Sequence, residues 1–168
     1  MYDNLHGWVN PRSELGEAWG DYLSSIANWD WWLTLTFRDP VPDPKRPGWN
    51  KPGYSYAKKG WREALGRMPA PAIGTIPWVR AFEVQKWRGA PHIHALVGGL
   101  DSKRYAEFGT WWWQEYGYGV VEEYDPNKKA SYYLCKYVSK TFGDIEFSNH
   151  FPVVPHLLSS AKKVEAVV

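Results

Sequence analysis

The stretch WDWWLTLTFRD, residues 29–39, carries the clearest strand pattern in the chain. Two sets of side chains alternate along it. The apolar set consists of Trp31, Leu33, Leu35 and Phe37, and the more polar set of Trp32, Thr34, Thr36 and Arg38. Because successive side chains of a strand point to opposite faces, this alternation predicts a strand with one apolar face and one polar face.

A hairpin is predicted further along the chain. The segments WVRAFEVQKW, residues 78–87, and PHIHALVGG, residues 91–99, have strand character and are separated by a turn at 88–90. Two strands joined by so short a link pair in antiparallel fashion. Shorter strand patterns occur in GYGVVEEYD, residues 117–125, and in DIEFS, residues 144–148.

Four helices are predicted from apolar residues at helical spacing. They span residues 11–28, 55–67, 101–116 and 127–141. Asp101 or Ser102 caps the third helix, and the fourth stops before Gly143. The proline-rich segment 39–54 is expected to be a loop. This order predicts an α+β fold, in which helices flank a central antiparallel sheet of about five strands.

The length of 168 residues suits a single domain that spans 1–168. Apolar residues make up 44% and charged residues 23%, which excludes a collagen, a coiled coil or a disordered tail. No stretch approaches the ~18 apolar residues of a membrane span, and the first residues lack the pattern of a secretion signal. Cys135, the single cysteine, cannot build a disulfide framework. We therefore expect a reduced, cytoplasmic setting without a membrane partner.

Aromatic residues are unusually frequent, with twelve tryptophans and eleven tyrosines, while the net charge is only +2. This composition is compatible with binding of single-stranded nucleic acid, because bases stack on aromatic rings. A large aromatic core is the simpler explanation, and composition alone favours it. The three tryptophans at 111–113 cannot share one helix face. At least one is therefore expected in a self-association surface or in a platform for bases.

The predicted hairpin contains the first group of residues with chemistry. His92 and His94 are two residues apart, so in a strand they project from one face about 6.5–7 Å apart, as ligands of one divalent metal ion would. Glu83 lies nine residues before His92, and closure of the hairpin would place it beside His92 on the same face. Gln85 could act there as an outer ligand or could orient one.

Two explanations stay open for this group. A His-x-His pair on a strand is common and a surface glutamate on a hairpin is ordinary, so these residues could bind nothing. As a metal site, two imidazoles and one carboxylate would leave coordination positions for water or substrate. Mixed nitrogen and oxygen ligation suits Mn²⁺, Mg²⁺ or Zn²⁺.

The segment ASYYLCKYVSK, residues 130–140, is the second such group. Tyr133 and Tyr137 are four apart and share one helix face, and Lys136 and Lys140 form an adjoining stripe. Forming a phenolate at pH 7 costs roughly 4 kcal/mol, which a nearby ammonium group and a metal-polarised phosphate could offset. Taken alone, the pattern favours an amphipathic helix that packs its tyrosines on the sheet.

Three segments in this order, WLTLTFRD, PHIHALV and YLCKYVSK, resemble the motifs of rolling-circle replication initiators (Rep proteins) of the HUH endonuclease superfamily. The resemblance covers residues 31–140. This motif core lies between the predicted helix 11–28 and a C-terminal extension, 141–168. The resemblance implies a five-stranded antiparallel sheet flanked by helices.

The resemblance also implies a role for each motif residue. His92 and His94 match the metal-binding histidines, and Glu83 matches the acidic third ligand that lies upstream. Tyr137 matches the nucleophile, Lys140 the lysine beside it, and Tyr133 the second tyrosine of initiators with paired nucleophiles. Contacts to DNA are expected from Arg38, Thr34, Thr36, Lys86, Arg88 and Trp87, with Trp32, Lys45 and Arg46 as further candidates. Each of these could also be an ordinary surface residue.

The predicted function is that of a metal-dependent, site-specific endonuclease and strand transferase for single-stranded DNA. It would start rolling-circle replication of a plasmid or virus at an origin, in a hairpin or loop, with Mn²⁺ or Mg²⁺ preferred to Zn²⁺. No G-x-x-x-x-G-K-[ST] motif occurs, so we expect no helicase domain and unwinding by a host helicase. The alternatives are a transposase or relaxase of the same chemistry, a non-catalytic DNA-binding module, and a metal enzyme acting on small molecules.

Overall fold

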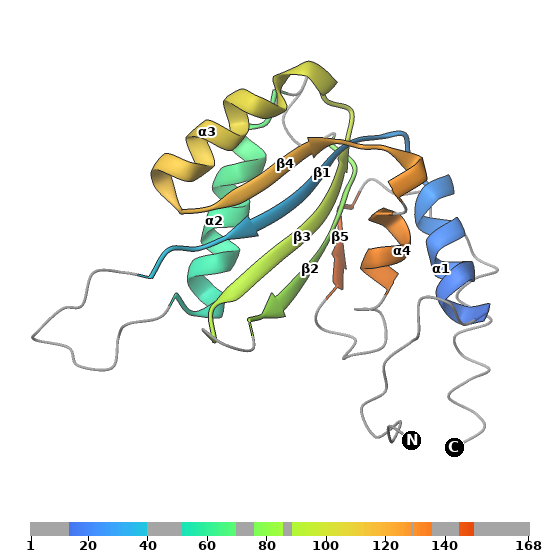
Figure 1. The fold of residues 1–168 in the computed structure, drawn as a ribbon, viewed down its shortest axis with the longest axis horizontal. Helices are drawn as coiled ribbons and strands as arrows, with labels where there is room; N and C mark the ends of the chain where they lie inside the picture. Colours follow the sequence, from blue (N-terminus) through green and yellow to red (C-terminus); the bar gives the residue numbers. More distant parts are fainter. Residues whose placement is uncertain are drawn as a thin grey trace, which may run out of the picture.

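The computed structural model describes residues 14–39, 52–69, 76–85, 89–128, 130–135 and 145–149. Within these ranges five strands form one antiparallel sheet in the order β4-β1-β3-β2-β5 (Figure 1). The strands are β1 (Trp29–Thr36), β2 (Trp78–Val84), β3 (Pro91–Gly98), β4 (Gly119–Glu123) and β5 (Ile145–Phe147). The predicted α+β class with a central antiparallel sheet is confirmed.

Four α-helices cover the two faces of this sheet in the described part of the chain. The helices α2 (Tyr54–Arg67) and α3 (Tyr105–Glu115) lie on one face, and α1 (Glu14–Ser25) and α4 (Ala130–Cys135) on the other (Figure 1). Short 3₁₀ turns, Ser102–Arg104 and Pro126–Lys128, precede α3 and α4. Among the helices that can be described, none has both the length and the apolar character of a membrane span.

The apolar face of β1 forms the centre of the larger core. Trp31, Leu33 and Leu35 are completely buried, as the alternation predicted. They pack against α2 and α3, which contribute the buried rings of Trp61 and Trp112. The strand pairs on both sides, with β3 and with β4, so its backbone groups are hydrogen-bonded within the sheet. Burial of each large apolar side chain here stabilises the fold by about 1.5–3 kcal/mol.

On the opposite face, α1 and α4 pack closely against each other. A Cβ on Gly20 would lie only 2.3 Å from the ring of Tyr132, so glycine permits this approach of α1 to α4. The Tyr132 hydroxyl donates a hydrogen bond to the carboxylate of Asp21. Cys135 is buried in the same region. Both Tyr132 and Cys135 serve packing, and together they fix the position of α4 and of Tyr133 on it.

Several predicted boundaries are wrong, and local hydrogen bonds explain why. The helix expected at 101–116 begins at Tyr105, because the Asp101 carboxylate accepts from the Lys103 N–H and stabilises a 3₁₀ turn first. The helix expected at 11–28 is described from 14 and ends at Ser25. The helix expected at 127–141 begins as a 3₁₀ turn, and its part beyond Cys135 lies outside the described residues.

The link in the hairpin is longer than predicted. Strand pairing stops at Val84 and Pro91, so β2 does not extend through 85–87. The Gln85 N–H donates to the Ala90 carbonyl, and the Gly89 N–H donates to the Gln85 carbonyl. These bonds make a six-residue connection in place of a three-residue turn. Most of the predicted loop 39–54 and most of the extension 141–168 lie outside the described residues.

Gly117 joins α3 to β4 and generates a prediction about stability. Its φ is +139°, and a Cβ there would lie 2.6 Å from the backbone nitrogen of Arg38. We expect Gly117→Ala to lower the free energy of unfolding by about 1–3 kcal/mol, measured by urea denaturation. Gly66→Ala is the matched control, since Gly66 is exposed in α2 and a Cβ would meet nothing within 4 Å. It should stabilise by up to ~1 kcal/mol, and equal stabilities of the two variants would contradict the strain expected at Gly117.

Candidate active site

The polar face of the sheet presents two neighbouring rows of side chains. In the first row, Thr36 of β1 and Glu83 of β2 flank His92 of β3 in register. In the second row, Thr34 and Ala81 flank His94. Both rows lie on the face that α1 and α4 cover, because these positions alternate with the buried residues of the larger core.

Each histidine is held from β1 by a threonine hydroxyl. Thr34 Oγ1 lies 3.2 Å from Nδ1 of His94, and Thr36 Oγ1 lies 3.3 Å from Nδ1 of His92. A threonine that occupies Nδ1 leaves Nε2 as the ring nitrogen available to a ligand. The structure thus places these two threonines against the imidazoles, and the predicted contact of either one with DNA stays a prediction.

Glu83 occupies the position that the hairpin spacing predicted, directly opposite His92. Its carboxylate reaches the diagonal neighbour, with Oε2 3.2 Å from Nε2 of His94. His94 is buried, and Glu83 is partly exposed. Both nitrogens of the His94 ring are therefore within hydrogen-bonding distance of a polar partner, Thr34 on one side and Glu83 on the other.

Two aromatic rings complete the surroundings of His94. Trp32 stacks on the imidazole with a centroid distance of 6.0 Å and an interplanar angle of 16°. Tyr133 of α4 approaches the imidazole edge-on at 5.2 Å and also contacts Trp32 at 5.7 Å. Tyr133 is 41% exposed, so solvent or a substrate can reach it. The structure thus brings the tyrosine-bearing helix and the histidine-bearing strand together on one face.

The neighbours of Tyr133 on α4 do not supply a nucleophile. The hydrogen bond to Asp21 raises the pKa of Tyr132 above its ordinary value, which favours the neutral phenol. Burial raises the pKa of the Cys135 thiol in the same sense. Tyr132 faces α1 and Cys135 lies in the core, so Tyr133 is the residue of α4 that faces the imidazoles.

His92, His94 and Glu83 have the donor chemistry that a divalent cation requires. The described ranges contain no group of three His, Cys, Asp or Glu side chains close enough to hold a metal ion as they stand. The imidazoles of His92 and His94 stack with their centroids 6.1 Å apart, and Glu83 is directed to His94. The three residues fit a cation by donor type and by face, while their side chains are not gathered around a single point.

Six of the predicted site residues lie outside the described residues. They are Lys136, Tyr137, Lys140, Lys86, Trp87 and Arg88. The same holds for Lys45 and Arg46. Arg38 is described and exposed, and its guanidinium donates to the carbonyls of Trp113 and Gln114 at the end of α3. Gln85 is partly buried at the start of the hairpin link.

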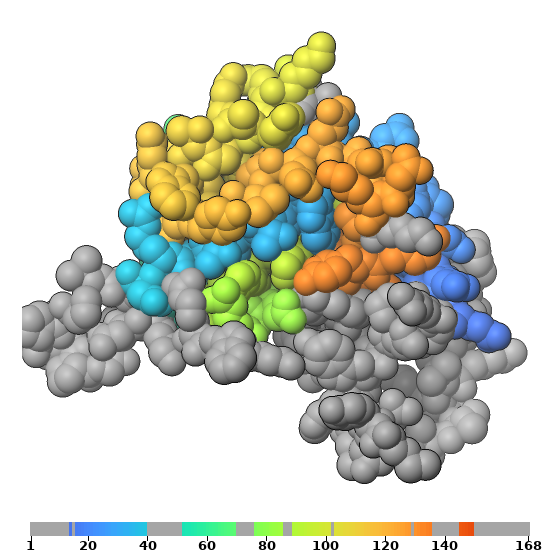
Figure 2. All heavy atoms as spheres, viewed as in Figure 1, coloured from blue at the N-terminus to red at the C-terminus, as the bar shows by residue number. Residues whose placement is uncertain are grey.

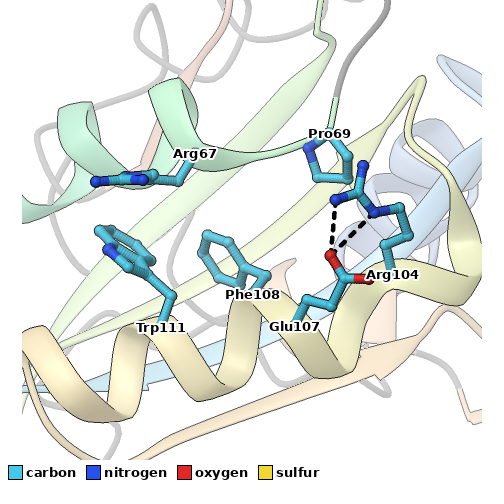
Figure 3. Close-up of a pocket in the computed structure, with 6 residues that line it drawn as sticks. All are labelled: Arg67, Pro69, Arg104, Glu107, Phe108 and Trp111. Atoms are coloured by element: carbon cyan, nitrogen blue, oxygen red, sulfur yellow. Dashed lines mark hydrogen bonds and ion pairs between the residues drawn. The ribbon is translucent and has the colours of Figure 1, made fainter.

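A small cavity of about 160 Å³ lies between α2 and α3, on the face of the sheet away from the histidines (Figure 3). The Arg67 guanidinium lies over the ring of Trp111 at 5.7 Å, and Arg104 forms an ion pair of 2.7 Å with Glu107. Its volume is below the ~300 Å³ at which small-molecule sites usually begin. The cavity is therefore separate from the candidate active site in position and in chemistry.

The comparison with protein families matches the part of the chain that contains this site. The family model of the replication-associated protein ORF2 matches residues 30–142, which is more than half of the 168 residues. The chain belongs to this family. The resemblance to rolling-circle replication initiators is thereby confirmed. The matched segment includes β1, the hairpin and the tyrosine-bearing segment.

One similar solved structure is the N-terminal nuclease domain of non-structural protein 1 from minute virus of mice. That structure is described as having Zn²⁺ coordination in its active-site pocket and a mode of DNA recognition at the origin of replication. The similarity covers 80% of this chain and 72% of that one, with 11% sequence identity and a TM-score of 0.30. No curated protein matches this chain significantly in sequence. Likeness at this level does not transfer a site or a ligand.

Sequence reasoning missed the contacts that surround the histidines. The sequence pattern assigns Thr34 and Thr36 to DNA contacts, whereas they lie against the Nδ1 atoms of His94 and His92. The available signal is their alternation with the core residues, which fixes the face but not the partner strand. Trp32 shares that face and stacks on His94.

Proposed function

We propose that this chain is a metal-dependent endonuclease and strand transferase that nicks single-stranded DNA at a replication origin. Its substrate would be an origin presented in a hairpin or loop, opened where needed by a host helicase, in a plasmid or virus. The observation that carries the proposal is the contact of Tyr133 with His94, which itself lies 3.2 Å from Glu83. A phenol, an imidazole and a carboxylate meet on one face, in a chain of the replication-associated family.

The proposed reaction is a transesterification by tyrosine. The Tyr137 oxygen attacks phosphorus, the bond from phosphorus to the 3′ oxygen breaks, and the phenol proton ends on the released 3′ hydroxyl. The 5′ end of the DNA stays linked as a phosphotyrosine. Because no water is consumed, the reverse step can rejoin strands. Tyr137 is assigned from sequence spacing, and Tyr133, which contacts His94, is the second candidate nucleophile.

Protein side chains would lower the cost of ionising the phenol. At pH 7 that cost is roughly 4 kcal/mol for an unperturbed tyrosine. Lys136 and Lys140 each follow one of the tyrosines by three residues, so their ammonium groups are assigned to stabilise the phenolate. Thr34 and Thr36 would keep both imidazoles oriented by occupying their Nδ1 atoms.

His92, His94 and Glu83 are the residues assigned to hold the cation, Mn²⁺ or Mg²⁺. A bound divalent cation would neutralise charge on the phosphate during the displacement. Glu83 and His94 are already paired, and His92 lies opposite Glu83 on the same face. Rotation of side chains, without a change in strand register, would bring the three donors together.

Covalent trapping tests the tyrosine chemistry. Single-stranded oligonucleotides that tile the replicon carrying the gene, incubated with the protein and Mn²⁺, should yield a protein–DNA adduct on a denaturing gel. Tyr137→Phe should remove the adduct, or leave only a fraction formed through Tyr133. Tyr132→Phe is the matched control, because this neighbouring phenol faces α1 and should retain full yield. A linked peptide that mass spectrometry maps to neither Tyr137 nor Tyr133 would refute the assignment.

Calorimetric titration with Mn²⁺ tests the metal site without requiring activity. We expect His92→Ala, His94→Ala and Glu83→Gln each to weaken binding at least ~10-fold, since each removes a donor. Glu123→Gln on β4 is the control for loss of one exposed carboxylate, and its affinity should be unchanged. Equal affinity of all four variants, or full adduct yield in excess chelator, would show that the metal role is wrong.

The threonine contacts generate a separate prediction. Thr34→Val keeps the shape of the side chain and removes the hydroxyl, so His94 loses the group at its Nδ1 atom. The affinity for Mn²⁺ should fall by roughly 10- to 100-fold, and Thr34→Ser should restore most of it. Thr110→Val, on the exposed face of α3, is the control. Nitrogen chemical shifts of the His94 ring should report a change of tautomer in Thr34→Val only, and an unchanged ring would count against the role.

A further inference from the structure

Exposed apolar side chains gather at one end of the sheet. Among the residues described, the large exposed ones are Tyr54, Tyr56, Val84, Trp113, Tyr118 and Tyr133. All except Tyr133 belong to elements that meet where β1 and β2 end and where β3 and β4 begin. That end carries His92. An accumulation of exposed rings at one place is more informative than single exposed residues, which are ordinary.

The most exposed aromatic pair is formed by Trp113 and Tyr118. Their side chains are 58% and 59% exposed, and their rings lie 6.1 Å apart at an interplanar angle of 82°. Trp113 is the member of the tryptophan run that stays exposed, since Trp112 is completely buried and Trp111 partly so. The space-filling view shows the end of α3, the start of β4 and the end of β1 as one continuous surface (Figure 2).

Tyr118 belongs to the same row of the sheet as His92. Its carbonyl accepts a 2.8 Å hydrogen bond from the Thr36 N–H, and Thr36 in turn pairs with His92. Tyr118 precedes Val120, the partner of Thr34, by two residues, so strand alternation assigns it to the histidine-bearing face. With neighbouring strands about 4.8 Å apart, the Tyr118 backbone lies roughly 10 Å from that of His92, a distance that a short single strand can bridge.

The scaffold beneath the pair is rigid and carries a cation. Gly117 permits the close approach of this segment to Arg38, and Trp112 Nε1 donates to the Thr36 carbonyl. The Arg38 guanidinium is fixed at the last carbonyls of α3, next to Trp113. Two exposed carboxylates, Asp39 and Glu115, flank this cation in sequence or at the helix end. The aromatic rings therefore have more to contribute to a nucleic-acid contact than the local charge.

We propose that Trp113 and Tyr118 form a stacking platform for bases of the single-stranded DNA that leads into the candidate active site. Every base has a ring face that can stack on an aromatic side chain, so such a platform is tolerant of sequence. The occupant is assigned as single-stranded DNA because the platform continues the row of His92 and Thr36, with Arg38 beside it for a phosphate. The inference rests on the proposed function, which supplies the DNA strand.

The test uses the full-length chain and a fluorescein-labelled oligothymidylate of about 15 nucleotides, with chelator present and no cleavage possible. Fluorescence anisotropy should show that Trp113→Ala and Tyr118→Ala each weaken binding roughly 5- to 100-fold. Trp113→Phe and Tyr118→Phe should keep most of the affinity. Trp19→Ala, on α1 and outside the platform, is the matched control and should bind as the wild type does. The loss should depend little on salt, unlike the loss of a phosphate contact.

The possible failures are distinguishable. Unchanged binding by both alanine variants would overturn the platform while leaving the nicking reaction untouched. The same holds if the variants lose only self-association in sedimentation, which would identify a second copy of the chain as the occupant. Wild-type protein that binds the oligonucleotide through these rings but never forms the tyrosine adduct would sustain the platform and refute the proposed reaction. Absence of any binding by the wild type would refute both.

Discussion

The period-two alternation of β1, fixed by pairing on both sides of that strand, is the constraint on which the core and the candidate site both depend. Leu33 and Leu35 are buried against α2 and α3, so Thr34 and Thr36 must face the other way, toward His94 and His92. A slip of one residue would exchange these two sets and bury hydroxyl groups in the larger core. Stability of the apolar face and orientation of the imidazoles therefore have a single structural cause.

The polar surroundings of His94 follow from its burial. A buried imidazole is costly unless its nitrogens have partners, and here Thr34 and Glu83 lie within hydrogen-bonding distance of the two nitrogens. A cation at this site would compete with the contact between Glu83 and His94. Its affinity would thus be the difference between two favourable arrangements, and the stacked Trp32 ring limits how far the imidazole can turn. The same packing holds Tyr133 at the edge of the site.

Regularities within one or two neighbouring segments could be read from the sequence. The alternation of β1, the pairing of Glu83 with His92 and the antiparallel hairpin depend on local periodicity, and the structure has them all. The contacts of β1 threonines with β3 histidines join residues 56 and 60 positions apart, and no local pattern specifies such a pairing. The start of α3 at Tyr105 was missed for a different reason, because a carboxylate cap can stabilise either a 3₁₀ or an α turn.

Exposure of one tryptophan at 111–113 could be expected, but its identity depends on where the edge strand passes. Trp112 points to the core because its indole donates to the Thr36 carbonyl, and Trp113 is then turned outward beside Tyr118. The proposed platform and the tyrosine of α4 consequently lie at different distances along the sheet, with the row of His92 nearer to the platform and the row of His94 nearer to Tyr133. In the proposed arrangement, a strand stacked on Tyr118 passes His92 before it reaches the phenol. The order of these rows thus gives the bound strand a direction across the sheet.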